Sequence, residues 1–198
     1  MSGLPQRFDS VEALEDFMSE PTPGLVADLA RVDGDIMVIG VGGKMGPTLA
    51  RMAKRAAPGK RVIGVARFSD PQARAMLEAH GVECIACDLL DREAVLKLPN
   101  VAYGVRNVVF MAGHKFGAAD NASLTWMMNV GVPAMVADIF RETRIVSFST
   151  ACVYPFDHRR DNAQGRPQLQ KAPLIRQRFA DGPRHILVYS LGHTLRQV

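Results

Sequence analysis

The sequence of 198 residues has no apolar run long enough to span a bilayer, and its first segment, Met1 to Glu20, is acidic and broken by proline rather than basic and apolar. These two absences argue against a membrane protein and against a secretory signal peptide.

Cysteine is also scarce. Three cysteines leave no disulfide framework to propose, and a reducing compartment, the cytoplasm, is the expected location.

Two of the cysteines, Cys84 and Cys87, form a CxxC pair inside an expected buried strand. No second pair of ligands accompanies them in the sequence. Structural thiols are therefore favoured over zinc or redox chemistry, and no metal site is predicted.

Over most of the chain, neither positively nor negatively charged residues are in clear excess. The formal net charge is +4, and the excess of lysine and arginine lies after Phe156, so the body of the protein is not basic. No basic stripe with interleaved aromatic residues occurs outside that tail, which argues against a nucleic-acid-binding protein. A hydrophobic content of 47% at this length predicts one domain with a single sizeable core.

The most informative stretch joins an apolar run of β-forming residues, 36–39, to glycines and then to residues with helical spacing. This pattern predicts a buried strand, a tight turn and the start of a helix. Gly40, Gly43 and Gly46 lie three apart, whereas the common dinucleotide fingerprint GxGxxG needs a glycine at Met45. Glycines let backbone N–H groups at the helix start approach a pyrophosphate, so a nucleotide is the expected ligand. The alternative is a tight turn that binds nothing.

Strand-like and helix-like segments alternate along the chain. Strands are expected at 36–39, 61–67, 82–87, 107–111 and 144–148, and helices at 45–57, 71–80, 91–98 and 122–142, the last one bent at 131–133. This alternation predicts an α/β fold, with a doubly wound parallel sheet and helices on both faces. Residues 1–34 are expected to form a short helical leader, with helices at 10–18 and 23–31. We expect a nucleotide-binding domain over 35–155 after this leader, and an atypical basic tail over 156–198.

Polar residues follow the strand ends, where an open parallel sheet binds its ligands. Arg67 lies about twenty residues after the glycines, where an acidic residue would select NAD and an arginine would pair with the 2′-phosphate of NADP. Asp88 follows the third strand and either faces an adenine or makes a turn. His114 and Lys115 could line the rim of a site. Asn129 is a poor helix former inside an expected helix, so it either faces solvent or has a specific role.

The order and spacing of these motifs resemble the NAD(P)-dependent epimerase/dehydratase family, the extended branch of the short-chain dehydrogenase/reductase superfamily. The resemblance covers residues 35–155 and rests on the glycine turn, Asp88-Leu89, Ala112-Gly113, Asn129-Val130 and Ser149-Thr150-Ala151-Cys152-Val153-Tyr154. It implies a Rossmann domain that binds NADP, or NAD as the alternative. It also implies oxidoreductase or epimerase-type hydride chemistry on a carbinol carbon of a small molecule, often a nucleotide sugar, and pairing of two copies through long helices.

Carried over by position, the resemblance implies a role for each matching residue. Those that would bind the cofactor are Gly40, Gly42, Gly43, Lys44, Met45 and Gly46 at the pyrophosphate, Arg67 at the 2′-phosphate, Asp88 and Leu89 beside adenine, and Ala112 and Gly113 beside the ribose. Those that would act in catalysis are Thr150, with Ser149 before it, as the hydrogen-bonding partner of the substrate oxygen, and Asn129 as a brace of the site.

One departure from the family is severe. The general acid/base of the family is a tyrosine followed four residues later by lysine, whose charge lowers the tyrosine pKa. In this sequence Tyr103 is followed by Asn107, Tyr154 by His158 and Tyr189 by His193. We therefore expect impaired catalysis, and a non-catalytic NADP-sensing regulator or interaction module is the alternative function.

The tail after Pro155 is rich in arginine, glutamine and proline and contains one strand-like piece, 184–189. One hypothesis is a reading-frame slip that leaves this tail out of frame or poorly ordered. Codons permitted for Leu174 to Gln177, read one base later, can spell Ser-Tyr-Ala-Asn, and sequencing the source DNA tests this. The alternative is a natural short homologue whose tail forms a sixth strand and binds a partner.

Overall fold

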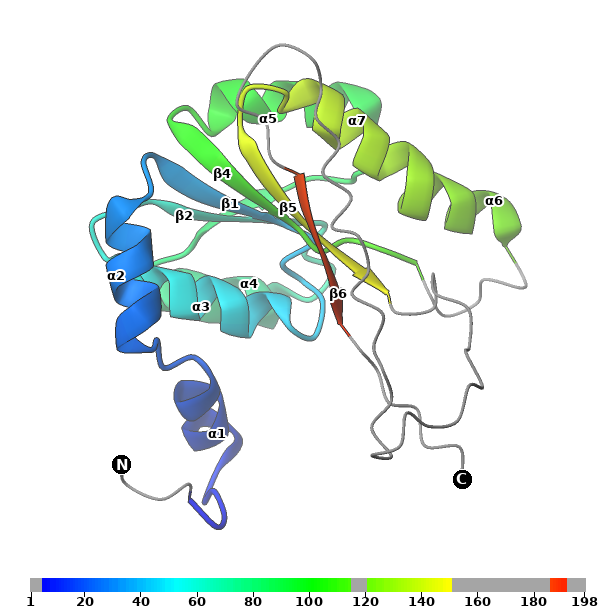
Figure 1. Cartoon of the computed structure of the whole chain (residues 1–198). Helices are drawn as coiled ribbons and strands as arrows, with labels where there is room; N and C mark the ends of the chain where they lie inside the picture. The colour runs from blue at the N-terminus through cyan, green and yellow to red at the C-terminus, as the bar shows by residue number, and fades with distance from the viewer. Residues whose placement is uncertain (1–4, 115–120, 151–185, 192–198) are drawn as a thin grey trace, which may run out of the picture.

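The computed structural model describes residues 5–114, 121–150 and 186–191 of the chain (Figure 1). Its centre is a sheet whose paired strands all run parallel, in the order β3-β2-β1-β4-β5-β6. The strands are β1 Asp35–Ile39, β2 Val62–Ala66, β3 Glu83–Ala86, β4 Val105–Phe110, β5 Arg144–Thr150 and β6 Ile186–Leu191. The predicted doubly wound α/β fold of Rossmann type is confirmed, and the winding reverses between β1 and β4.

Helices join the strands and cover the sheet. They are α1 Val11–Met18, α2 Pro23–Arg31, α3 Gly46–Ala56, α4 Pro71–Ala79, α5 Arg92–Val101, α6 Ala122–Trp126, the π-helix η1 Met127–Gly131 and α7 Val132–Ile139. Five of them begin on a side-chain oxygen that accepts a hydrogen bond from an N–H group of the first turn, and these oxygens belong to Ser10, Thr22, Asp70, Asp91 and Asn121. By contrast, α3 follows Met45 without any such bond.

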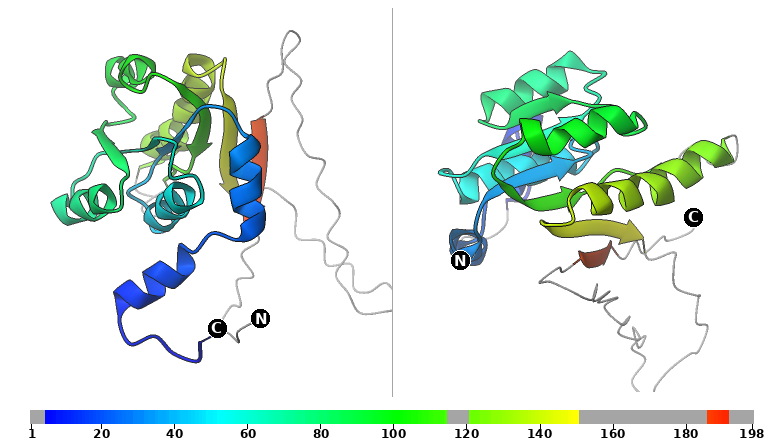
Figure 2. Two further views of the ribbon diagram at one scale, coloured as in Figure 1. Left: turned by 90° about the vertical axis from the view of Figure 1, so that its left-hand side faces the viewer. Right: turned by 90° about the horizontal axis from the view of Figure 1, so that it is seen from above.

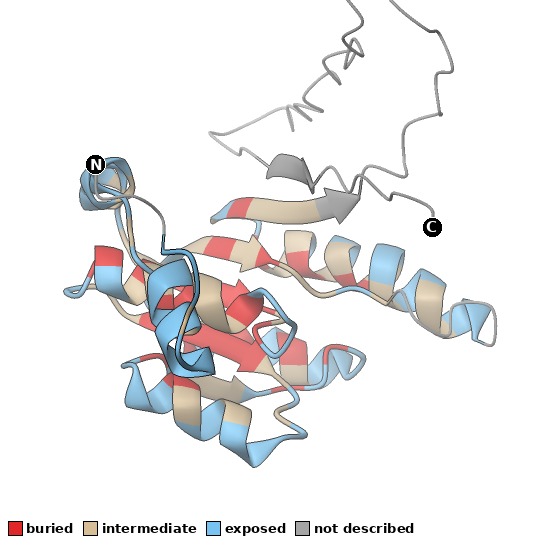
Figure 3. Cartoon of the chain, turned by 90° about the horizontal axis from the view of Figure 1, so that it is seen from below, coloured by how far each residue is buried: buried red, intermediate tan, exposed pale blue. Residues whose placement is uncertain are grey.

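The central strand β1 is buried on both faces, which explains why it reads as an unbroken apolar run. Met37 and Ile39 pack in one core cluster with residues of α5 and α7, while Val38 packs in a second cluster with residues of α3 and α4. All three side chains are fully buried. Figure 3 shows the buried positions gathered in the strands and on the inner sides of the helices.

The segment expected as one bent helix over 122–142 is α6, η1 and α7 in succession, and it ends at Ile139. Pro133 has no N–H to donate to the carbonyl of Asn129, and its ring crowds that carbonyl. The wider π turn that precedes the proline gives its ring room. The helix type thus changes directly before and at the predicted bend position, 131–133.

Other element boundaries also differ from expectation. α5 continues through Pro99 to Val101 although the sequence predicts an end at Leu98, because a proline so near the C-terminus removes only one hydrogen bond of the helix. β5 extends to Thr150, because β6 pairs with it up to that residue.

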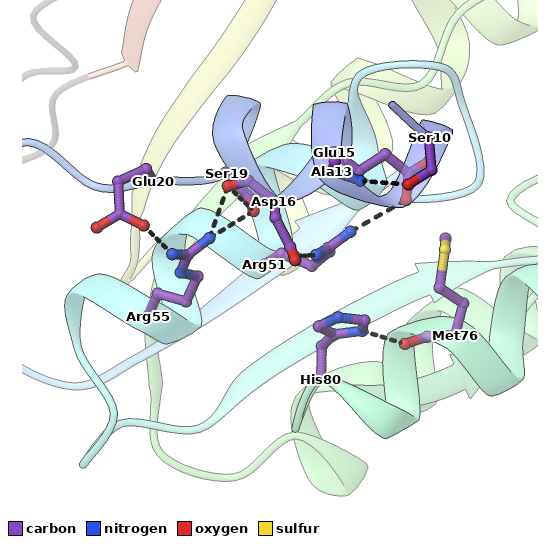
Figure 4. A network of polar contacts seen from close by, with 10 residues as sticks. All are labelled: Ser10, Ala13, Glu15, Asp16, Ser19, Glu20, Arg51, Arg55, Met76 and His80. Carbon is purple, nitrogen blue, oxygen red and sulfur yellow. Dashed lines mark hydrogen bonds and ion pairs between the residues drawn. The ribbon is translucent and has the colours of Figure 1, made fainter. Parts of the chain in front are cut away.

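The leader helix α1 lies away from the sheet, on the side of the domain that α3 covers (Figures 1 and 2). Two arginines of α3 hold it there (Figure 4). Arg51, whose side chain is only 4% exposed, donates to Glu15 Oε2 at 3.0 Å and also pairs with Asp16. Arg55 pairs with Glu20. The charged side of α1 thus faces the domain, and its exposed apolar residues are Val11, Leu14, Phe17 and Met18.

Removing the carboxylates that pair with Arg51 is expected to destabilise the protein. Arg51 Nε is buried without a hydrogen-bond partner in the described part of the chain, so its guanidinium depends on Glu15 and Asp16. In the double variant Glu15→Gln, Asp16→Asn, we expect the free energy of unfolding to fall by about 1–2 kcal/mol, because Arg51 is buried but Glu15 is only partly buried and Asp16 is exposed. Urea denaturation measures this change. The control Glu78→Gln breaks the exposed pair with Arg74 and should cost less than about 0.5 kcal/mol, and equal losses in the two proteins would contradict the prediction.

Candidate functional site

The turn between β1 and α3 lies at the carboxyl edge of the sheet, where the winding reverses. Gly40 opens the turn with a φ of +88°. A Cβ on Gly40 would lie 2.6 Å from the backbone nitrogen of Ala112, just beyond the end of β4. The N–H groups of Gly40 and Val41 both donate to the carbonyl of Val65 in β2, at 2.8 and 3.2 Å. Only glycine fits at position 40, and the turn is held between the ends of β2 and β4.

The other glycines of the turn meet different neighbours. A Cβ on Gly46 would lie 2.2 Å from the carbonyl oxygen of Val41, so this glycine lets α3 start close against the strand. A Cβ on Gly43 would meet nothing closer than the carbonyl oxygen of Gly40 at 3.6 Å, an ordinary contact, and Gly43 is exposed. The fold therefore requires glycine at 40 and 46, whereas at 43 the missing side chain leaves the outer face of the turn open.

The first turn of α3 is suited to an anion. No side chain caps it, so its N–H groups and the positive end of the helix dipole face the turn. Lys44 and Met45, the residues before the helix, are exposed, and Lys44 forms no ion pair or side-chain hydrogen bond with any described residue. A negatively charged group at this position would gain backbone N–H donors and a nearby cation.

Arg67 follows the end of β2, the strand next to β1. A Cβ on Gly42 would lie 3.2 Å from the Cβ of Ala66, which places the end of β2 directly beside the glycine turn. Arg67 is exposed and has no ion-pair partner among the described residues. The next residue, Phe68, has a φ of +50° and packs partly against the second core cluster, so the chain turns away from the sheet just after the arginine. The guanidinium is available to an anion that enters the turn.

Asp88 and Leu89 both have contacts within the fold. Asp88 is exposed, and its Oδ1 accepts a hydrogen bond from the N–H of Leu90 at 3.0 Å, which is the turn-making role that the sequence left open. The side chain of Leu89 is buried in the first core cluster. Any contact of Leu89 with a ligand would therefore come from its backbone.

The segment after β4 is fixed by Asn129 of η1. The side chain of Asn129 accepts a hydrogen bond from the N–H of His114 at 2.8 Å and donates to the carbonyl of His114 at 2.9 Å. A Cβ on Gly113 would lie 3.4 Å from Asn129 Oδ1, so a small residue suits that position. His114 Nδ1 also lies 3.0 Å from Thr125 Oγ1 of α6. Sequence analysis singled out Asn129, but Thr125 gave no signal because threonine is unremarkable near the start of a helix.

Ser149 and Thr150 end β5, two strands away from β1 on the β4 side of the sheet. Their backbones pair with Ser190 and Leu191 of β6 and lie at the same carboxyl edge as the glycine turn. Their side chains are outside the described residues, as are Lys115, Cys152, Tyr154 and the segment of the proposed reading-frame slip.

Several groups in or next to β3 have shifted pKa values. Burial raises the pKa of the Cys84 and Cys87 thiols, which keeps them protonated and unreactive. Hydrogen bonds from Arg61 lower the pKa of Glu83, at the opposite end of the strands.

Within the described ranges, no group of three or more histidine, cysteine or acidic residues could hold a metal ion. None of the helices in these ranges has the length and apolar character that a membrane span requires.

The profile of a known family, described as the NAD dependent epimerase/dehydratase family, matches residues 36–179. A comparison with curated proteins finds no match.

Several solved structures resemble the chain. The ADP-L-glycero-D-manno-heptose-6-epimerase of Helicobacter pylori is 18% identical, with a TM-score of 0.56, over 67% of this chain and 44% of that one. An epimerase of Methanothermobacter thermautotrophicus is 21% identical, with a TM-score of 0.55, over 68% and 41%. A UDP-glucose-4-epimerase of Stenotrophomonas maltophila, with bound NAD and formylated UDP-arabinopyranose, is 16% identical, with a TM-score of 0.52, over 61% and 38%. The chain matches less than half the length of these structures, and the likeness concerns the fold.

Proposed function

Because the chain belongs to the NAD dependent epimerase/dehydratase family, we propose that it binds a nicotinamide dinucleotide at the turn between β1 and α3. The observation that carries this proposal is the start of α3, which has no side-chain cap and lies behind glycines that keep its approach open. A diphosphate there would accept hydrogen bonds from backbone N–H groups and would lie at the positive end of the helix dipole.

The residues around the turn fit such a cofactor. Those that would hold the diphosphate are Gly40, Gly42, Gly43, Lys44, Met45 and Gly46, and those that would pass beside the rest of the molecule are Asp88, Leu89, Ala112 and Gly113. Arg67 would pair with a 2′-phosphate, so the preferred form is NADP, with NAD as the alternative. When bound, the cofactor supplies a nicotinamide ring that exchanges a hydride with the substrate.

We further propose oxidoreductase or epimerase-type chemistry on a carbinol carbon of a sugar-nucleotide-like molecule, in the cytoplasm. The substrate class comes from similar solved structures that are named as epimerases, two of which carry sugar-nucleotide names. Thr150, with Ser149 before it, would hydrogen-bond the substrate oxygen. Asn129 would brace the segment after β4 through its two hydrogen bonds to the backbone of His114.

A second candidate is a non-catalytic regulator that senses NADP through the same turn. It is favoured by one feature of the sequence, in which no tyrosine is followed four residues later by lysine. Cofactor binding does not separate the two candidates. Hydride transfer does, because the absorbance of reduced nicotinamide changes with a carbonyl or sugar substrate only if the chain is an enzyme.

Calorimetric titration of the full chain tests the proposal. We expect NADP⁺ to bind at least about tenfold more tightly than NAD⁺, because one charge-assisted bidentate contact contributes about 1.5–3 kcal/mol. The fragments 2′,5′-ADP and 5′-ADP should show the same order, which assigns the difference to the 2′-phosphate. If neither dinucleotide binds, the proposed function is wrong, and if NAD⁺ binds more tightly, the NADP assignment alone is wrong.

A further inference from the structure

His114 occupies a defined place beside the proposed cofactor site. It follows Gly113 beyond the end of β4, two residues after Ala112, whose backbone nitrogen would lie 2.6 Å from a Cβ on Gly40. The parallel strands β1, β4 and β5 end at this edge of the sheet. His114 is half-buried, so its ring is neither sealed in the core nor fully in solvent.

The backbone of His114 is held at both of its polar groups. Asn129 Oδ1 accepts from the N–H at 2.8 Å, and Asn129 Nδ2 donates to the carbonyl at 2.9 Å. An asparagine that makes two hydrogen bonds to one residue fixes both the position and the orientation of that residue. The side chain that extends from it therefore starts from a fixed point.

The hydrogen bonds of Thr125 favour one tautomer of the neutral imidazole ring. Thr125 Oγ1 lies 3.0 Å from the carbonyl oxygen of Asn121, which can only accept, so the threonine hydroxyl donates its one proton there. The same Oγ1 lies 3.0 Å from His114 Nδ1, and both contacts are hydrogen bonds when Nδ1 carries the proton and donates to Oγ1. Neutral His114 thus carries its proton on Nδ1, and Nε2 has a free lone pair.

This arrangement suits a group that gains and loses a proton at one atom. Protonation of Nε2 leaves the Nδ1–H bond to Thr125 unchanged, because Nδ1 donates in both states. Neither the ring position nor the contact with α6 has to change during a proton transfer. An imidazole with one nitrogen anchored and the other basic is the usual form of a histidine general base.

We propose that His114 accepts and returns the substrate proton through Nε2, in a sequence that has no tyrosine-lysine pair for this task; the inference rests on the proposed function. In the oxidative direction, the carbinol O–H proton passes to Nε2. The C–H bond breaks with its electron pair transferred to the oxidised nicotinamide, and a carbonyl remains. The reverse reaction returns the hydride to carbon and the proton from Nε2 to oxygen.

Nitrogen-15 NMR of the full chain, labelled at histidine, tests the tautomer without a substrate. We expect neutral His114 to show a protonated Nδ1 and an unprotonated Nε2. His80 is an internal reference, because its Nδ1 lies 2.8 Å from the carbonyl of Met76 and has to donate there as well (Figure 4). In the variant Thr125→Val, His114 should lose its preference for a protonated Nδ1, while the tautomer of His80 should stay the same. A proton on Nε2 of neutral His114 in the unaltered protein would overturn the proposal.

Acylation with diethyl pyrocarbonate tests whether Nε2 faces the cofactor site. We expect mass spectrometry to show acylation of His114 that is several-fold slower with saturating NADP⁺, and acylation of His80 that does not change. If His114 is acylated at the same rate with and without bound NADP⁺, the proposal is overturned and the proposed function stays intact. If NADP⁺ does not bind at all, the proposed function fails and this assignment fails with it.

Hydride transfer with NADP⁺ and UDP-glucose as probes completes the test. His114→Gln should lower the rate by about 100-fold or more, with the dissociation constant of NADP⁺ changed by less than about twofold. Equal turnover in the two proteins, including none in either, would overturn the assignment of His114 as the proton acceptor.

Discussion

Gly46→Ala is expected to weaken dinucleotide binding by about 100-fold or more and to lower the free energy of unfolding by roughly 1–3 kcal/mol. The added Cβ would lie 2.2 Å from the carbonyl oxygen of Val41, and this neighbour is backbone and cannot rotate away. The start of α3 must therefore move from β1, and its N–H groups move with it. Loss of two hydrogen bonds to a charged diphosphate, at about 1.5–3 kcal/mol each, accounts for the loss of affinity. Urea denaturation and calorimetric titration measure the two effects.

Two other glycines provide matched controls for Gly46→Ala. Gly43→Ala places its Cβ at an ordinary distance from the chain, 3.6 Å, so we expect little change in stability but weaker binding, because the methyl group occupies the open face of the turn. Gly59→Ala adds a methyl group with no atom within 4 Å and should change neither quantity. Normal binding in Gly46→Ala would show that the start of α3 does not contact the ligand. Normal binding in Gly43→Ala would place the ligand away from the outer face.

Arg67→Ala is expected to remove the preference for NADP⁺ and to leave the affinity for NAD⁺ within about twofold of the unaltered protein. Arg67 is exposed, has no ion-pair partner in the described ranges and lies at the end of the strand beside the glycine turn, so a 2′-phosphate is the charge it can neutralise. Arg67→Lys keeps the charge but loses the bidentate geometry, and an intermediate preference is expected. Titration of each variant with both dinucleotides gives the ratios.

The control for Arg67→Ala is Arg74→Ala, an exposed arginine of α4 whose Nε donates to Glu78 at 2.8 Å. This substitution also removes one positive charge from the protein, so it measures any nonspecific electrostatic effect on a polyanionic ligand. We expect an unchanged ratio of the two affinities. An equal loss of preference in both variants would mean that net charge, rather than a contact at position 67, selects the cofactor.

The order of strands and helices could be predicted from the sequence because a parallel sheet buries both faces of its strands. The runs that became β1 and β2 are continuous and apolar for this reason, and glycine or proline marks the helix ends between them. The predicted helix at 23–31 is confirmed as α2, which starts at Pro23 after the cap residue Thr22. Boundaries were less accurate where a neighbour decides them, as at the end of β5, which pairs with β6.

The contacts of the candidate site depended on tertiary placement and could not be predicted in full. Asn129 stood out as an asparagine inside a helix, but its partner, the backbone of His114, lies on another element. The π turn around Asn129 was not predicted either, because Asn129, Gly131 and the following Pro133 indicate an irregular helix but not a change of helix type. The docking of α1 gave no signal either, since Arg51 resembles any solvated arginine until Glu15 and Asp16 are brought beside it.

If a dinucleotide binds at the uncapped start of α3, the folding equilibrium depends on the concentration of free dinucleotide. Five helices of the described chain satisfy their first N–H groups with an oxygen of their own, a contact that typically contributes about 1 kcal/mol, whereas α3 does not. A diphosphate bound there would provide the missing acceptor and would bind the native state alone. Thermal tolerance and resistance to proteases would then rise with the concentration of free dinucleotide, so the lifetime of the protein would follow the metabolic state around it.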